Sequence, residues 1–338
     1  MPVNVSIIVP VYNVEPFVGD CIKSVMNQTY QGGMECIIVD DGCTDGSMAV
    51  IEKLLRRYQG HIRFELCRHD KNRGLSAARN TGTMVASGEY LFYLDSDDIM
   101  ATNCIEMLMA QTLPESEVEL VQGNTEAIPV KLSASYTRHF SMLHAKGNQE
   151  VRYCYYLNEQ MPCNAWNKLV KRDFLLKHDL LFKEGSLYED VLWSFHLMKY
   201  LSNVKFVSEV TYYTRFRPGS IMSGTDQFTS AIHYQRLYQD ILTDLTIGFE
   251  KMELAFYAKA FAKMYVSRVR VLPELKALYQ KYWDRAWGFG LIGTCARLSF
   301  NRFLGMFKWG WIVVGMMRRI EQPSRLKDDI DRIQHRMK

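Results

Sequence analysis

Short apolar runs alternate with amphipathic segments over the first 125 residues. Runs rich in β-branched and aromatic residues that are too short for helices indicate buried strands. These predicted strands cover Val3–Val9, Glu35–Val39, Ile62–Cys67, Glu89–Leu94 and Val118–Gln122. Helical spacing predicts helices over residues 17–26, 47–58, 75–86 and 102–111, the second of them capped by Ser47. Such alternation predicts an α/β fold, a mostly parallel, Rossmann-like sheet with helices on both faces.

The pattern changes after about residue 125. Residues 125–150 give only weak strand signals, and residues 166–180 have a helical pattern. A further helix is expected to open at Leu187–Asp190, followed by short strands at Val204–Val207 and Val210–Tyr213. Beyond Gly224 nearly everything has helical period. We therefore expect an α/β domain over residues 1–223, with halves 1–124 and 125–223, and a C-terminal helical region over 224–338.

Charge is distributed unevenly along a chain of ordinary globular composition. The net charge is +4, yet residues 1–110 carry −5 and residues 224–338 carry +8. An acidic head and a basic tail suggest that the two ends meet different partners. Eight cysteines occur without a C-x-x-C pair, which disfavours a zinc site, and the absence of a signal peptide at the start favours a reducing, cytoplasmic location.

Residues 285–320 contain six basic side chains and no acidic one, with Trp and Phe between them. Their longest charge-free stretch has 11 residues, short of the ~20 needed to span a bilayer. This composition favours peripheral contact with an anionic membrane surface, at the inner face of the cell membrane. A helical appendage packed on the enzyme or on a second subunit is the alternative, so homo-oligomer formation stays open. Nucleic acid is disfavoured, because the acidic first half would repel it.

The strand at 89–94 runs directly into Asp95-Ser96-Asp97-Asp98. The carboxyl edge of an open α/β sheet is where ligands bind. Three neighbouring carboxylates repel one another, and a divalent cation such as Mg²⁺ or Mn²⁺ would neutralise them. Taken alone, this stretch fits a metal site and a helix-capping turn equally well.

Other polar segments are expected at the same edge. They are Pro10-Val11-Tyr12-Asn13, Asp40-Asp41-Gly42, and the basic stretch from Asp70 to Asn80. Carboxylates for a metal beside arginines for anions suit a diphosphate ligand. No P-loop is present and no G-x-G-x-x-G motif follows the first strand, which disfavours a dinucleotide fold of the dehydrogenase kind. A nucleotide held by paired aspartates and a metal remains.

These segments together resemble glycosyltransferase family 2, nucleotide-sugar transferases of the A-type fold. The resemblance rests on Val5–Asn13, Ile37–Gly42, Asn72-Arg73-Gly74 with Ala78-Arg79-Asn80, and Leu94–Asp98, and covers residues 1–223. Cys43 departs from the family, which usually has Ser there.

The resemblance implies a role for each matching position. Asp41 would accept a hydrogen bond from the base, expected to be uracil, and Pro10 and Tyr12 would shape the base pocket. Asp95, with Ser96, would lie near the ribose or metal, and Asp97 would bind the metal. Arg79 would stabilise the leaving diphosphate. Apart from the resemblance, Asp98 is the carboxylate of this stretch that we expect only to cap the next helix.

The second half supplies a general base by the same resemblance. Asp190, in Tyr188-Glu189-Asp190, matches the base of the family's Glu-Asp motif, although two acids at a helix start are also favoured by the helix dipole. Trp166 and Lys168 resemble residues beside the acceptor site, and Trp166 fits a core position equally well. Arg215 and Ser220 fall in a segment similar to the family's flexible loop.

We therefore predict a metal-dependent, inverting glycosyltransferase that uses a UDP-sugar donor. Its acceptor would be a glycan, expected to be lipid-linked, in surface or capsular polysaccharide synthesis of the bacterial type. Two alternatives remain: a sugar nucleotidyltransferase, for which Pro10–Asn13 lacks glycine and basic residues, and a non-catalytic nucleotide-sugar-binding module.

Overall fold

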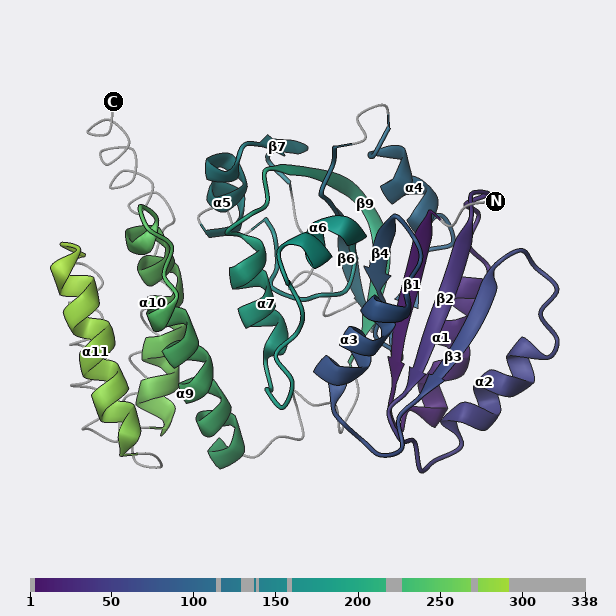
Figure 1. Ribbon diagram of the computed structural model, residues 1–338, viewed down its shortest axis with the longest axis horizontal. Helices are drawn as coiled ribbons and strands as arrows, with labels where there is room; N and C mark the ends of the chain where they lie inside the picture. The colour runs from purple at the N-terminus through teal and green to yellow at the C-terminus, as the bar shows by residue number, and fades with distance from the viewer. Residues whose placement is uncertain are drawn as a thin grey trace. The chain divides into compact units, whose positions relative to one another are not determined.

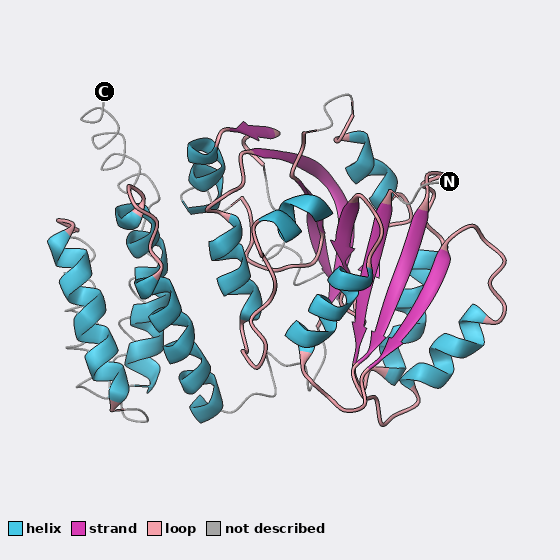
Figure 2. Ribbon diagram, in the orientation of Figure 1, coloured by secondary structure: helices cyan, strands magenta, loops and turns pink. Residues whose placement is uncertain are grey.

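The computed structural model describes residues 4–113, 117–128, 137, 140–156, 160–216, 227–268 and 273–291. Its contacts divide the chain into two compact units, Met1–Gly224 and Thr225–Lys338. The first unit is a twisted sheet with flanking helices, and the described part of the second is helical (Figures 1 and 2). The predicted fold class is thereby confirmed.

The first unit contains one sheet with strand order β3-β2-β1-β4-β8-β6-β9-β5, and β7 pairs with β9 outside this path. Strands β1, β2, β3 and β4 are mutually parallel, as are β6 and β9. The strands are β1 (Val5–Val11), β2 (Met34–Asp40), β3 (Arg63–Arg68), β4 (Tyr90–Tyr93), β5 (Ile99–Met100), β6 (Leu120–Ile128), β7 (His144–Lys146), β8 (Lys168–Lys171) and β9 (Asn203–Arg215).

Helices cover both faces of this sheet. Helix α3 packs on β1 and β2, while α1 lies behind the strands and packs against α2 (Figure 1). Every residue of β1 and β2 is buried, as expected of strands covered on both faces. The helices of this unit are α1 (Glu15–Met26), α2 (Ser47–Leu55), α3 (Leu75–Val85), α4 (Cys104–Ala110), α5 (Asn148–Tyr156), α6 (Arg172–Lys177) and α7 (Glu189–Leu197).

The segment predicted as one helix over residues 166–180 is instead strand β8 followed by the short helix α6. Strand β8 lies antiparallel between β4 and β6. Asn167 adopts a left-handed backbone conformation (φ 58°), which a continuous helix does not allow. The helical prediction was wrong because Leu169 and Val170 fit helical and strand spacing equally well, and only the neighbouring strands decide.

Two local predictions are also corrected. The strands expected at 204–207 and 210–213 form one strand, β9, whose pairing with β6 shifts register between them. Ser47 does not cap its own helix: its Oγ accepts a hydrogen bond from Val14 N, and Asp45 Oδ1 accepts one from Ser47 N instead.

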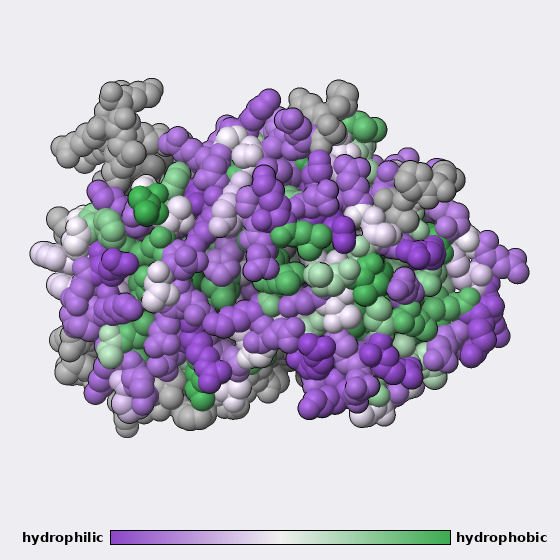
Figure 3. Space-filling view, viewed as in Figure 1, coloured by the Kyte–Doolittle hydropathy of each residue, from purple (hydrophilic) through white to green (hydrophobic). Residues whose placement is uncertain are grey.

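The described part of the second unit contains α9 (Gln227–Thr243), α10 (Glu250–Arg268) and α11 (Glu274–Gly288), each in contact with the other two. Aromatic packing holds them, because the Phe261 ring of α10 stacks on Tyr282 of α11 with centroids 4.6 Å apart. Hydrophilic residues cover much of the face drawn in Figure 3. In the described part of the chain, no helix has both the length and the apolar character that crossing a bilayer requires.

Candidate active site

The strand ends of the parallel half meet at one edge of the sheet. Tyr12 follows β1, Asp41 follows β2, and Asp95 lies just after β4. Pairing continues past the strands, since Asp41 N donates to Val11 O (2.9 Å) and Leu94 N donates to Ile8 O (3.0 Å). The predicted donor-binding positions therefore do share an edge, with Pro10 buried inside β1 and the Tyr12 ring 45% exposed beyond it.

Asp41 organises the basic loop that precedes α3. Its Oδ1 accepts hydrogen bonds from His69 Nδ1 (2.7 Å) and Arg73 N (2.8 Å), and its Oδ2 accepts one from Gly74 N (2.8 Å). A carboxylate has about four lone-pair sites. Three are used by residues that the structure describes, and the side chain is 3% exposed, so at most one lone-pair site is left for a donor group of a ligand.

The acidic turn, defined as Asp95 to Asp98, contains carboxylates with different partners. Asp95 is partly exposed, and its Oδ1 accepts a hydrogen bond from Arg79 Nη2 (2.7 Å). Burial raises the pKa of Asp95, the Arg79 charge opposes that shift, and the charge of Asp97 adds to it. Asp97 is partly exposed, and Ser96 is buried.

Asp98 is not the helix cap that we predicted. Its side chain is buried and accepts hydrogen bonds from the Tyr212 hydroxyl (2.8 Å) and from Arg215 N (2.7 Å). The next helix, α4, begins only at Cys104 and has no side-chain cap. Burial and the charges of Asp95 and Asp97 raise the pKa of Asp98 well above its usual value. Asp98 thus fastens the acidic turn to strand β9.

Arg79 joins the acidic turn to the start of α7. Only 2% of its side chain is exposed, and Nη1 donates to Glu189 Oε1 at 2.7 Å while Nη2 donates to Asp95 Oδ1. Its guanidinium carbon lies 5.2 Å from the centre of the Phe182 ring. Burial lowers the pKa of Arg79, but the negative charges of Asp95, Glu189 and Asp190 have the larger effect and raise that pKa above its usual value.

Glu189 and Asp190 form the first turn of α7, and they differ sharply in their contacts. Glu189 is bonded to Arg79, whereas the half-buried Asp190 side chain makes no hydrogen bond or ion pair with any residue that the structure describes. Tyr188, just before them, has a left-handed backbone (φ 63°). That conformation costs a bulky residue about 1–3 kcal/mol, and such strain clusters at functional sites.

The surroundings of Asp190 make its carboxyl group hold a proton up to a higher pH than it would in water. Burial, together with the neighbouring charge of Glu189, raises the pKa of Asp190 to about 7, while Arg79 and Lys168 act in the opposite direction. Lys168 is itself buried and donates from Nζ to the carbonyl oxygens of Pro162 and Asn164. Burial lowers the pKa of Lys168 to about 7. A carboxyl group with a pKa near neutrality suits general acid–base chemistry.

Trp166 packs against strand β9. Its ring stacks on Tyr212, with centroids 4.7 Å apart and planes 12° apart, so one face is committed to the protein. Arg215, at the end of β9, places its Nη2 3.3 Å from Asp20 Oδ2. Ser220 lies outside the described residues. The roles of Trp166 and Lys168 beside an acceptor, and of Arg215 and Ser220 in a flexible loop, stay predictions.

A divalent metal could use this edge only together with a ligand. Among the residues with described positions, no group of three or more His, Cys, Asp or Glu could hold a metal. Mg²⁺, however, is usually bound by one or two carboxylates plus substrate phosphates. The acidic turn offers such a pair, because Asp97 is partly exposed and Asp95 Oδ2 accepts no hydrogen bond from the described part of the chain. The donor set therefore fits the group.

Several residues of this network were not singled out from the sequence. Tyr212 accepts a hydrogen bond from Asp95 N (3.2 Å) and donates one to Asp98, which ties the acidic turn from both ends. His69 bridges Asp41 and Thr81 Oγ1 (2.9 Å). His69 lies in no recognisable motif, and Tyr212 begins the segment that resembles the family's flexible loop, but only the pairing of distant segments reveals the contacts of both.

The known proteins that this chain resembles are glycosyltransferases. Residues 6–177 match the family described as Glycosyl transferase family 2. The chain is 30% identical over 246 residues to the uncharacterized glycosyltransferase EpsJ of Bacillus subtilis, covering 70% of this chain and 67% of EpsJ. It is 25% identical over 302 residues to the cholesterol galactosyltransferase of Borreliella burgdorferi, covering 83% and 81%.

Two solved structures have a similar fold. S. aureus TarS 1-349 in complex with UDP-GlcNAc superposes with a TM-score of 0.55 at 18% identity, covering 85% of this chain and 92% of TarS. The mannosyltransferase PcManGT of Pyrobaculum calidifontis, in complex with GDP-Man and Mn²⁺, gives a TM-score of 0.57 at 16% identity, covering 94% and 86%. At these identities the likeness shows the fold.

Proposed function

Because the chain belongs to glycosyltransferase family 2, we propose that it transfers a sugar from a UDP-sugar to an acceptor hydroxyl with inversion at the anomeric carbon. The membership and the fold account for the class of enzyme. The donor, the base and the stereochemistry are inferred from the site.

The environment of Asp41 supports a uracil base. At most one lone-pair site of its carboxylate remains after three internal hydrogen bonds. Uracil has a single ring N–H at its pairing edge, which one acceptor satisfies, whereas guanine presents a ring N–H and an amino group together. Tyr12, which is 45% exposed and follows the strand that pairs with the strand before Asp41, would stack on the base, and Pro10 would support it.

Asp97 and the second oxygen of Asp95 would hold Mg²⁺ or Mn²⁺ together with the donor diphosphate. Such an ion, when bound, supplies charge stabilisation to the leaving diphosphate. PcManGT, which has a similar fold, was solved with GDP-Man and Mn²⁺, which supports a metal-bound donor diphosphate here. The partly exposed position of the acidic turn leaves room for phosphate oxygens as further ligands.

Asp190 would act as the general base. Its carboxylate takes the proton of an acceptor hydroxyl while that oxygen bonds to the anomeric carbon. The bond from this carbon to the diphosphate oxygen breaks on the opposite face, and UDP leaves with the electron pair. Inversion follows from this single displacement. A Brønsted base with a pKa near the working pH serves this proton transfer better than an ordinary aspartate.

One observation carries the proposal: Asp190 is half-buried beside a bonded network of acids and Arg79, yet its own side chain has no partner among the described residues. A screen of UDP-, GDP- and dTDP-sugars, with and without Mn²⁺, tests it. We expect metal-dependent hydrolysis or thermal stabilisation with a UDP-sugar. Turnover of a GDP- or dTDP-sugar in its place would contradict the uracil assignment, and binding without any turnover would indicate a non-catalytic module.

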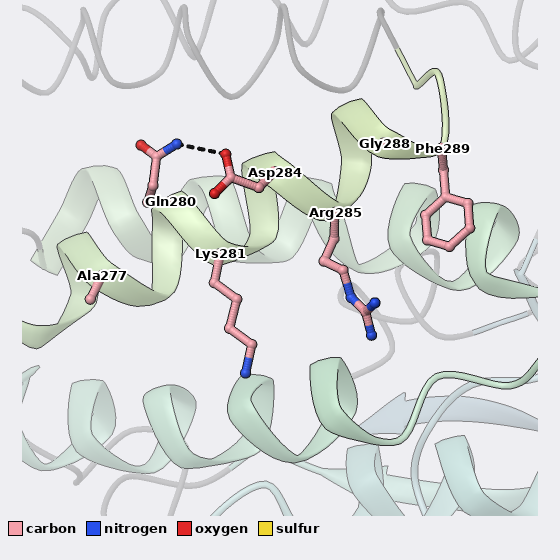
Figure 4. Close-up of a pocket in the computed structure, with 7 residues that line it drawn as sticks. All are labelled: Ala277, Gln280, Lys281, Asp284, Arg285, Gly288 and Phe289. Carbon is pink, nitrogen blue, oxygen red and sulfur yellow. Dashed lines mark hydrogen bonds between the residues drawn. The ribbon is translucent and has the colours of Figure 1, made fainter.

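We also infer an acceptor of the glycan or lipid-linked class, met at a membrane surface. The Borreliella relative is named for a lipid acceptor, cholesterol. In the described part of α11, Trp287 is 56% exposed and stacks on Trp283. A pocket of about 700 Å³ lies along α11. Figure 4 shows Lys281 and Arg285 extending to the same side of α11, toward a neighbouring helix, and Arg285 Nη2 donates to Leu242 O of α9 at 3.5 Å. Residues 292–320 of the basic aromatic region lie outside the described residues.

Vesicle sedimentation tests this membrane contact. The full chain should bind vesicles that contain phosphatidylglycerol and not neutral phosphatidylcholine vesicles, and the variant W287A should bind less. Equal binding of the wild-type chain and W287A to both vesicle types would contradict the inference, as would the absence of any binding by the wild-type chain.

A further inference from the structure

Arg79 is a buried cation that joins the acidic turn to the segment around α7, and Arg73 makes a second, exposed ion pair to that segment, with Glu184. Arg79 belongs to α3, and its two terminal nitrogens donate to carboxylates that lie in different halves, Asp95 in the acidic turn and Glu189 in α7. Both distances are 2.7 Å, and the side chain is 2% exposed. A forked pair of charge-assisted hydrogen bonds fixes direction as well as distance.

Asn80, the next residue, binds the same second-half segment. Its Nδ2 donates to Phe182 O and its Oδ1 accepts from Phe182 N, both at 2.8 Å. A side-chain amide thus satisfies both main-chain groups of one residue, as a neighbouring strand would. Two consecutive residues of α3 therefore hold the segment that leads into α7 at two points, Phe182 and Glu189.

Aromatic packing makes this attachment rigid. The Phe182 ring lies beneath the Arg79 guanidinium and stacks on Trp193 of α7, with ring centroids 4.9 Å apart. Tyr93 of β4 meets both rings edge-on. The Trp193 indole also donates to Leu180 O at 3.0 Å. The start of α7 is thereby packed against β4, the strand that leads into the acidic turn.

We propose that Arg79 and Asn80 form a latch that positions Asp190 against the donor site, so that Arg79 acts through Glu189 and Asp95 and does not bind the leaving diphosphate. This Arg79–Asn80 latch rests on the proposed function, because it presumes that Asp190 takes the acceptor proton. Glu189 makes the contact with Arg79 that holds the start of α7, and this contact fixes the position of the adjacent Asp190.

The burial of Arg79 favours this role over contact with the diphosphate. Both terminal nitrogens of Arg79 already donate to carboxylates, at 2.7 Å each, and only 2% of the side chain is exposed, so a phosphate group would have to displace an existing ion pair. The remaining nitrogen of Arg79, Nε, is also buried and has no hydrogen-bond partner in the described part of the chain. Asn80 has no charge with which to bind a diphosphate, yet it binds the same segment as its neighbour.

The variant R79Q separates the two roles. Equilibrium binding of UDP and of UMP, each with Mn²⁺, is measured together with kcat at saturating donor. If Arg79 and Asn80 act as a latch, the kcat of R79Q falls by about 100-fold or more, within the range known for misplaced catalytic groups. The ratio of UDP to UMP affinity stays within about threefold of the wild-type value, as for any residue that does not touch the diphosphate. A selective loss of UDP affinity of about tenfold or more, with kcat retained, would show that Arg79 binds the diphosphate and would overturn the latch.

The variant N80A tests the latch even if R79Q fails to fold. We expect faster hydrogen exchange at the Phe182 amide and along the start of α7, a kcat lowered by about tenfold or more, and an unchanged stoichiometry of UDP binding. Unaltered exchange and kcat in N80A would refute the latch. R56K, which alters an exposed Arg–Glu pair on α2, is the matched control and should change neither quantity.

The exchange measurement also distinguishes two kinds of failure. If the wild-type chain transfers no sugar from any nucleotide donor, the proposed function fails. The exchange rates of α7 in R79Q and N80A then still report whether the attachment exists.

Discussion

The acidic turn and the start of α7 are two acidic regions that Arg79 connects, and they use their carboxylates in different ways. In the turn, Asp95 is bonded to Arg79, and Asp98 is bonded to Tyr212 and Arg215. In α7, Glu189 is bonded to Arg79, whereas Asp190 has no partner among the residues described. A cluster of acids seen in a sequence therefore contains members that build geometry and members that remain available for chemistry.

The difference has a physical basis. A buried carboxylate is costly unless donors satisfy it, so most acids at this edge are matched by donors from other segments. Asp190 is instead left without one and keeps its proton more readily, with a pKa raised to about 7 by burial and by Glu189. The absence of a partner where burial would favour one is the mark of a functional group.

The largest expected effect comes from replacing the unpartnered acid. D190N should lower kcat by about 10²–10⁴-fold, because an amide cannot take the acceptor proton. The matched variant E189Q should lose much less, since the Gln oxygen can still accept the hydrogen bond from Arg79. Steady-state kinetics with the preferred UDP-sugar measures both. Similar losses of kcat in D190N and E189Q would show that the two acids of α7 do not differ in their roles in catalysis.

The second prediction concerns the exposed part of the acidic turn. D97A should weaken Mn²⁺-dependent binding of UDP by at least about tenfold, or about 1.4 kcal/mol. Binding of uridine, which lacks the diphosphate, should stay as in the wild type. Isothermal titration calorimetry with each ligand decides, and a D97A variant with the wild-type response to Mn²⁺ would remove Asp97 from the metal site.

Next comes the hydroxyl that ties the turn together. Y212F keeps the ring stacked on Trp166 but removes the bonds to Asp95 N and Asp98 Oδ2. Leaving such buried groups unsatisfied should lower the free energy of unfolding by about 1–3 kcal/mol and weaken UDP binding with Mn²⁺. Y213F is the control, because successive residues of a strand face opposite sides. Equal behaviour of the two variants in denaturant unfolding and UDP titration would contradict this account.

The smallest effect is a shift in pH dependence. Activity requires ionised Asp190, so kcat/KM should fall as pH drops through about 7. The positive charge of Lys168 lowers the pKa of Asp190, so K168M should raise that pKa and move the acid limb to higher pH. The variant should therefore lose activity at pH 6 and match the wild type near pH 9. A profile that stays in place, or moves to lower pH, would contradict the coupling of the two groups.

The parallel half was predictable from the sequence because its strands are covered on both faces. Strands β1 and β2 are apolar runs that end in polar loops, and their order along the chain fixes which edge collects Tyr12, Asp41 and Asp95. The antiparallel part was not predictable in this way. Strand β8 is only four residues long, and its strand conformation depends on pairing with β4 and β6.

Within the site, the sequence indicated which residues gather but not which of them pair. Motif positions placed Arg79, Asp95 and Asp190 together, yet the choice of Glu189 over Asp190 as the partner of Arg79 depends on the turn of α7 after the left-handed Tyr188. The sequence suggested that Asp98 caps a helix. Its actual partners, Tyr212 and Arg215 of β9, lie 114 and 117 positions further along the chain, where no local pattern points to them. Long-range pairing of this kind has no local signal.

The central claim is that an acceptor oxygen displaces UDP in one step, with Asp190 as the base. The most direct test is the anomeric configuration of the product formed by the wild-type chain from its preferred UDP-sugar, read by proton NMR at early times. The account predicts the configuration opposite to that of the donor. A product that retains the donor configuration would contradict it.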